Sequence, residues 1–99
     1  MKYTDDLVLR SREIIKQVKE AEKLNKPIAK LVKEQIEIME AHKDEFIKRA
    51  DELGLNGFAR ARTEIQLYSN IKYWANKIGL PTEKYEKAIK DIRAKFIDE

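Results

Sequence analysis

Three short breaks divide this chain into four segments, and each segment repeats its apolar residues at helical spacing. Asn25 and Pro27 mark the first break, Gly54 the second and Gly79 the third. Glycine just after a helical pattern is typical of a C-terminal cap, because glycine adopts the left-handed conformation without strain. Proline suits the first turn of a helix, where its missing N–H costs nothing. The sequence therefore predicts helices at about residues 5–24, 27–53, 57–78 and 83–97.

The connections between these helices are short, which limits how the helices can be arranged. With only about two to four residues between them, consecutive helices have to turn back on each other and lie antiparallel. We expect an all-α fold, an antiparallel up-down-up-down four-helix bundle with short loops, in which residues 1–99 form one domain. The second helix is much longer than the fourth, so it would have to kink, overhang the bundle or pack against a second copy.

The composition argues against several kinds of site. The chain has no cysteine, and therefore neither a disulfide framework nor a thiolate metal site. With His42 as the only histidine and no nucleophile–base pair, the sequence predicts no enzyme activity, no cofactor and no metal site. No apolar run approaches the ~20 residues that span a bilayer, and residues 1–6 lack the hydrophobic region of a secretory signal. We expect a cytoplasmic protein.

Residues 65–76 form the least charged stretch of a chain in which 39% of the residues are charged. Lys72 is its only charged residue. On a helical wheel, the apolar residues of helix 57–78 cover about half of the circumference, which predicts a central helix packed against neighbours on two sides. Arg60 and Glu64 fall inside this apolar arc, one turn apart, where they can neutralise each other. The apolar arc consists of Phe58, Ala61, Ile65, Leu67, Tyr68, Ile71, Trp74, Ala75 and Ile78.

The opposite face of the same helix differs from the outer faces of the other helices, which carry mainly lysine and glutamate. It presents neutral hydrogen-bonding side chains, one tyrosine and two cations. The centres of protein interfaces are depleted in Lys and Glu and enriched in Tyr and Arg. We interpret this face as a partner-binding surface, with ordinary surface variation as the alternative. The candidate residues are Arg62, Gln66, Ser69, Asn70, Tyr73 and Lys77.

These features predict a small non-enzymatic binding protein that docks a macromolecular partner, with a protein as the favoured partner. Compact basic helical bundles of this size include immunity proteins, phage or plasmid accessory factors and subunits of complexes, an analogy of size and charge only. The alternative is a nucleic-acid-binding regulator, because the whole net charge of +3 arises from residues 54–82. Its phosphate and base contacts would come from Arg60, Arg62, Lys72 and Lys77.

Helix 27–53 carries two patterns that each have an ordinary and a functional interpretation. Gln35, His42 and Arg49 recur every seven residues beside the apolar stripe, as polar residues do where helices pair. They predict either a homodimer or structural oligomer joined through this helix, or side chains that flank the stripe and reach solvent. Acidic ridges on helices can hold Mg²⁺ for phosphate chemistry, but the ridge of this helix is expected to be a solvated face whose charges pair with neighbouring lysines. The ridge consists of Glu34, Glu37 and Glu40.

Overall fold

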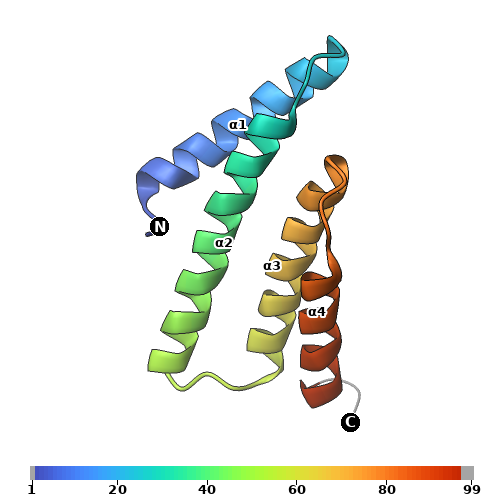
Figure 1. Ribbon diagram of the computed structural model, residues 1–99. Coiled ribbons are helices and arrows are strands. Elements are labelled where there is room, and N and C mark those ends of the chain that lie inside the picture. Colours follow the sequence, from blue (N-terminus) through green and yellow to red (C-terminus); the bar gives the residue numbers. More distant parts are fainter. Residues whose placement is uncertain (1, 97–99) are drawn as a thin grey trace.

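The computed structural model describes residues 2–96, which form four helices joined by turns (Figure 1). Helix α1 spans Asp5–Lys23, α2 spans Ala29–Glu52, α3 spans Phe58–Lys77 and α4 spans Glu83–Phe96. The helices run alternately up and down, so the predicted all-α antiparallel four-helix bundle is confirmed. Residue 97, the last of the predicted fourth helix, lies outside the described residues. Each connection holds five residues, slightly more than expected.

Gly54 and Gly79 end α2 and α3 in the way that the sequence predicts. Both glycines lie in the left-handed region, with φ angles of +66° and +69°. The N–H of the leucine after each glycine donates to the carbonyl five residues back, at 2.9 Å in the first turn and 3.0 Å in the second. This pattern satisfies carbonyl groups that a helix end would otherwise leave without partners.

Asn25 takes the same role at the end of α1, with a φ angle of +57°. The N–H of Lys26 donates to the carbonyl of Ala21 at 2.8 Å. Pro27 lies ahead of α2 and not in its first turn, because that helix begins at Ala29. The predicted role of this proline is therefore wrong, although the predicted break is in the right place.

The bundle is open between its first and last helices. Helix α1 crosses the upper part of α2 obliquely, whereas α3 packs between α2 and α4 (Figure 1). Within residues 2–96, no Cα atom of α1 comes within 8 Å of one in α3 or α4. The molecule is elongated and flat, with extents of 46 × 27 × 18 Å. On the lower part of α2, the side away from α3 consequently has no helix packed on it, and neither has the outer side of α3.

The core lies where α1 crosses α2 and where side chains of α3 reach the crossing. Ile14 and Val18 of α1 pack with Val32 and Ile38 of α2, and all four are at most 2% exposed. Burying each such side chain contributes roughly 1.5–3 kcal/mol. Trp74 of α3 packs against the same cluster. Helix α3 therefore contacts α2 and α4 along its length and reaches α1 near its end, in agreement with the predicted central position.

Phe58 does not belong to the core, although the helical wheel places it on the apolar arc of α3. Its side chain is 55% exposed, and two leucines at the same turn, Leu53 and Leu55, are 67% and 49% exposed. These residues lie at the turn between α2 and α3, and α4, which approaches this turn near Asn56 and Arg60, leaves them uncovered within residues 2–96. The wheel describes the sides of a helix correctly, but it does not show which part of each side a neighbouring helix covers.

Candidate functional site

Helix α3 packs against α2 and α4 with one side and leaves its outer side uncovered. Ala61, Ile71 and Ala75 are at most 1% exposed. The residues on the far side of the helix are exposed, apart from Ser69 and Lys77, which are half-buried. We call this side the α3 surface and define it by Phe58, Arg62, Gln66, Ser69, Asn70 and Tyr73.

The α3 surface has an exposed aromatic ring at each end. Phe58 is 55% and Tyr73 is 59% exposed, and at 1.5 Å per residue they are separated by about 22 Å along the helix. The Arg62 guanidinium lies 5.8 Å from the centre of the Phe58 ring. Midway along the surface, Nε2 of Gln66 donates to Oδ1 of Asn70 at 2.9 Å. The arrangement offers two apolar anchors with hydrogen-bonding groups between them.

Lys77 completes the predicted set of residues, but it takes part in the contact between α3 and α1. Its Nζ lies 3.3 Å from the Glu22 carboxylate, and it lies 5.0 Å and 5.6 Å from the ring centres of Tyr73 and Trp74. Burial lowers the pKa of Lys77, but the contacts with Tyr73 and Glu22 outweigh this effect and the pKa is raised. A groove of about 250 Å³ separates the two helices at this point. Lys77 thus holds α1 to α3 and supports one face of Tyr73.

Arg60 is a partly buried junction between α2 and α3. Its guanidinium pairs with Asp51 at 2.8 Å and with Glu64 at 3.2 Å, and it donates to the carbonyl of Leu55 at 2.7 Å. Glu64 is only 7% exposed, and without this partner its carboxylate would be buried and unpaired. The predicted neutralisation of Arg60 by Glu64 is confirmed. The side chain binds to both helices and to the turn between them, and little of it remains exposed.

The cations predicted to contact nucleic acid are therefore not equivalent. Arg60 and Lys77 are paired as described, and Lys72 lies 3.2 Å from the Glu86 carboxylate of α4. Of the four, only Arg62 has no ion pair with another residue in the described part of the chain. Three of the four positive charges are already neutralised by the fold.

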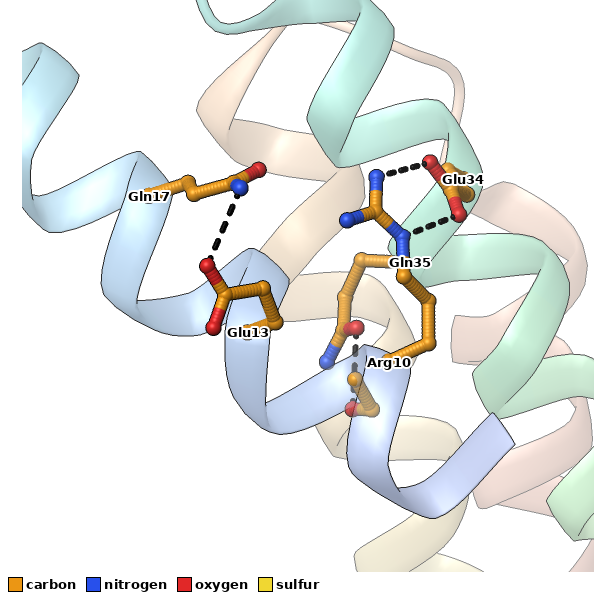
Figure 2. A network of polar contacts seen from close by, with 6 residues as sticks. Arg10, Glu13, Gln17, Glu34 and Gln35 are labelled. Atoms are coloured by element: carbon orange, nitrogen blue, oxygen red, sulfur yellow. Dashed lines mark hydrogen bonds and ion pairs between the residues drawn. The ribbon is translucent and has the colours of Figure 1, made fainter. Parts of the chain in front are cut away.

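Gln35, the first member of the predicted heptad row, is buried between α2 and α1 of the same molecule. It is 2% exposed, and its Oε1 accepts a hydrogen bond from the Ser11 hydroxyl at 2.9 Å. Figure 2 shows the neighbouring contact, in which the Arg10 guanidinium makes two hydrogen bonds to the Glu34 carboxylate, at 2.6 and 2.7 Å. The oblique crossing of α1 over α2 is thus fastened by polar pairs beside its apolar core.

The other two members of the row lie progressively farther from α1. His42 is exposed and stacks on the ring of Tyr3, which lies just before α1. The two ring centres are 4.5 Å apart and the planes are inclined by 9°. Arg49 lies below the reach of α1 and is exposed. The heptad row therefore follows the decreasing coverage of α2 by α1. A homodimer joined through α2 stays a prediction, but Gln35 is not available to it.

A cluster around Glu40 between α2 and α4 was not predicted. The Tyr85 hydroxyl donates to Glu40 at 2.6 Å, and Lys43 lies 2.8 Å from the same carboxylate. Lys43 also lies 5.1 Å from the centre of the Tyr68 ring. The expected pairing of the ridge with a neighbouring lysine is confirmed at Glu40, but this residue is only half-exposed, because Tyr85 of α4 lies against its carboxylate. The spacing of Glu40 and Lys43 indicates their pairing, but no local pattern identifies Tyr85 as the third member.

Electrostatic effects in this cluster oppose one another. Burial raises the pKa of Glu40, but hydrogen bonds from Lys43 and Tyr85 outweigh burial, and the pKa lies below its ordinary value. Burial, followed by the bond to Glu40, raises the pKa of the Tyr85 hydroxyl well above its ordinary value. Two shallow hollows of about 370 and 520 Å³ flank the cluster and share Ile36, Lys84 and Tyr85. The cluster joins α4 to α2 through fully paired groups.

Neither a metal centre nor a membrane span is seen in residues 2–96. No three or more His, Cys, Asp or Glu side chains gather there in a way that could hold a metal ion. None of the helices in this range is both long and apolar enough to cross a membrane. Comparison of the chain with protein-family models, with curated proteins and with solved structures finds no match. The chemistry of the chain's own surfaces is therefore the evidence for its function.

Proposed function

We propose that this chain is a small, non-enzymatic, cytoplasmic binding protein that docks a protein partner through the α3 surface. The observation that carries the proposal is the exposure of two aromatic rings and an arginine on one uncovered side of a helix. Aromatic and arginine side chains contribute most of the binding energy in many protein interfaces once a partner excludes water from them. Phe58 and Tyr73 would be the anchors, and Arg62 would bind a carboxylate or a carbonyl of the partner.

The residues between the anchors also suit an interface. Gln66 and Asn70 are neutral, and burying a neutral amide that finds new hydrogen bonds costs less free energy than burying a charge. A contrasting surface is the exposed side of α2 that we call the α2 charged face, defined by Glu45, Lys48, Arg49 and Glu52. A partner has to remove water from four charges there, but from only one charge on the α3 surface.

A nucleic-acid partner is less well supported. Binding to a phosphate backbone strengthens with the number of cations that are available to replace counterions. Arg60, Lys72 and Lys77 already pair with carboxylates, which leaves Arg62 as the available cation of the set. Binding of DNA or RNA fragments that weakens steeply between low and moderate salt would favour this alternative over a protein partner.

The test is a pull-down from the source cells with immobilised protein, followed by titration of the purified partner. We expect the double variant Arg62→Ala with Tyr73→Ala to bind that partner at least about tenfold more weakly than the original protein. The matched control is Glu45→Ala with Lys48→Ala on the α2 charged face, which should bind normally. All three proteins should unfold at nearly the same temperature, because every substituted side chain is exposed.

Two results would contradict the proposal. The first is a partner whose affinity is unchanged by the α3 double variant, since its contact would then lie elsewhere. The second is a double variant that unfolds many degrees below the control, since the α3 surface would then contribute to the fold and would not be a free face.

A further inference from the structure

The α3 surface reads almost the same from either end. From its N-terminal end the order is an aromatic ring, an arginine, a glutamine, a pair of small polar residues and a second aromatic ring. Gln66 stands at the centre, with Phe58 eight residues before it and Tyr73 seven residues after it. A surface with this symmetry can contact a second copy of itself when the two helices run antiparallel, as an isologous interface requires.

The groups that would meet in such a pair complement one another. With Gln66 of both copies on the twofold axis, Arg62 of one copy faces Asn70 of the other, whose amide oxygen accepts a hydrogen bond. The two amides of Gln66 face each other, and an amide can both donate and accept. The Cα atoms of the two Arg62 residues would lie about 12 Å apart along the direction of the helices, so the repulsion between their charges is largely screened.

A hollow on the surface lies where the second tyrosine would arrive. Ala59, Arg62, Thr63 and Gln66 line a shallow depression of about 400 Å³ on the exposed side of α3. In the antiparallel register centred on Gln66, Tyr73 of the second copy comes opposite Ala59. The small side chain of Ala59 leaves room for that ring, and interfaces place aromatic anchors in such hollows.

We propose that the α3 surface binds a second copy of this chain, with the two α3 helices antiparallel and Gln66 on the twofold axis. The inference rests on the proposed docking role of the α3 surface and names its occupant. It also moves self-association from α2 to α3. The surface is a single helix side about 22 Å long, which is small compared with the roughly 800 Å² per partner of standard interfaces. The dimer is therefore weak and depends on concentration.

The experiment is light scattering or sedimentation of the whole chain from about 1 to 200 µM, the range in which a small interface associates. The original protein should pass from a mass near 11.7 kDa towards twice that value. Gln66→Glu and Gln66→Lys should each stay monomeric, because like charges then meet on the axis. An equal mixture of the two variants should form heterodimers, because opposite charges meet there. The control is Lys87→Gln, at an exposed position of α4, and this variant should dimerise like the original protein.

Three outcomes would overturn self-pairing through α3. One is an original protein that stays monomeric throughout the range, and in that case the α3 surface is left for a different protein. Another is a dimer that survives both Gln66 variants and is lost with Arg49→Glu, which would place the contact on α2. The third is a pair of Gln66 variants that remain monomeric when mixed. These results decide only whether the occupant is a second copy of this chain. Docking of a different protein on the α3 surface is judged separately, by the binding of that protein to the Arg62 and Tyr73 double variant.

Discussion

Two sides of this bundle have no helix packed on them, and their chemistry differs. The α2 charged face mixes acids and bases at helical spacing, with Arg49 one turn after Glu45 and Glu52 one turn after Lys48. The α3 surface is equally uncovered, but it presents two aromatic rings and neutral amides. A helix side that only meets water is well served by the first composition, and the second composition leaves apolar rings in water.

The comparison of the α2 charged face with the α3 surface shows that an exposed helix side is not by itself suited to binding a partner. Both sides are open because α1 crosses only the upper part of α2 and does not approach α3 along its length. Exposure alone therefore identifies both, and only the side-chain chemistry distinguishes them. The comparison assumes that the side chains of both open sides are free while nearby side chains beneath other helices are covered, and this assumption can be tested in matched pairs of residues.

The largest difference in stability is expected between alanine variants of two arginines that are two residues apart on α3. Arg60→Ala leaves the buried Glu64 without its partner and should lower the free energy of unfolding by about 3 kcal/mol. Arg62→Ala, on the α3 surface, should change it by less than about 0.5 kcal/mol. For a chain of this size the first change lowers the melting temperature by at least about 10 °C. Equal melting temperatures of the two variants would show that Arg60 is not a covered residue.

A smaller effect is expected from the two ends of the heptad row on α2. Gln35→Ala removes the acceptor of the Ser11 hydroxyl beneath α1 and should cost about 1–2 kcal/mol, measured by urea unfolding. Arg49→Ala lies where α1 no longer covers α2 and should cost less than about 0.5 kcal/mol. A costly Arg49 variant would mean that the lower part of α2 is covered in solution, and the comparison of two open faces would no longer hold.

The elements of this fold that are local in sequence could be predicted from the sequence. The glycine turns depend on Gly54 and Gly79 alone, and the period of a helix shows which residues share the outer side of α3. Arg60 and Glu64 are one turn apart on the same helix, so their pairing could be predicted as well.

The parts that could not be predicted depend on how far one helix extends along another. The exposure of Phe58 depends on which part of α3 the neighbouring helices cover, and the burial of Gln35 depends on the angle at which α1 crosses α2. Lys77 finds Glu22 and Glu40 finds Tyr85 across 55 and 45 residues of sequence. Many lysines and glutamates in this chain have the same local surroundings, so no local pattern selects these pairs.

The smallest difference in stability is expected between variants of two glutamates on the same ridge of α2. Glu40 is half-exposed and contacts α4, whereas Glu37 is exposed. The pKa of Glu40 lies below its ordinary value in the folded protein. Its charge therefore stabilises the fold above the unfolded pKa of about 4.3, and this contribution is lost as the pH falls through the folded pKa. Glu40→Gln should lower stability at pH 7 by about 1 kcal/mol and flatten the loss of stability below pH 5, followed by thermal unfolding between pH 7 and 3. Glu37→Gln should keep the stability at pH 7 within about 0.5 kcal/mol of the original protein. If Glu40→Gln loses stability in acid as steeply as the original protein, the charge of Glu40 does not hold α4 to α2.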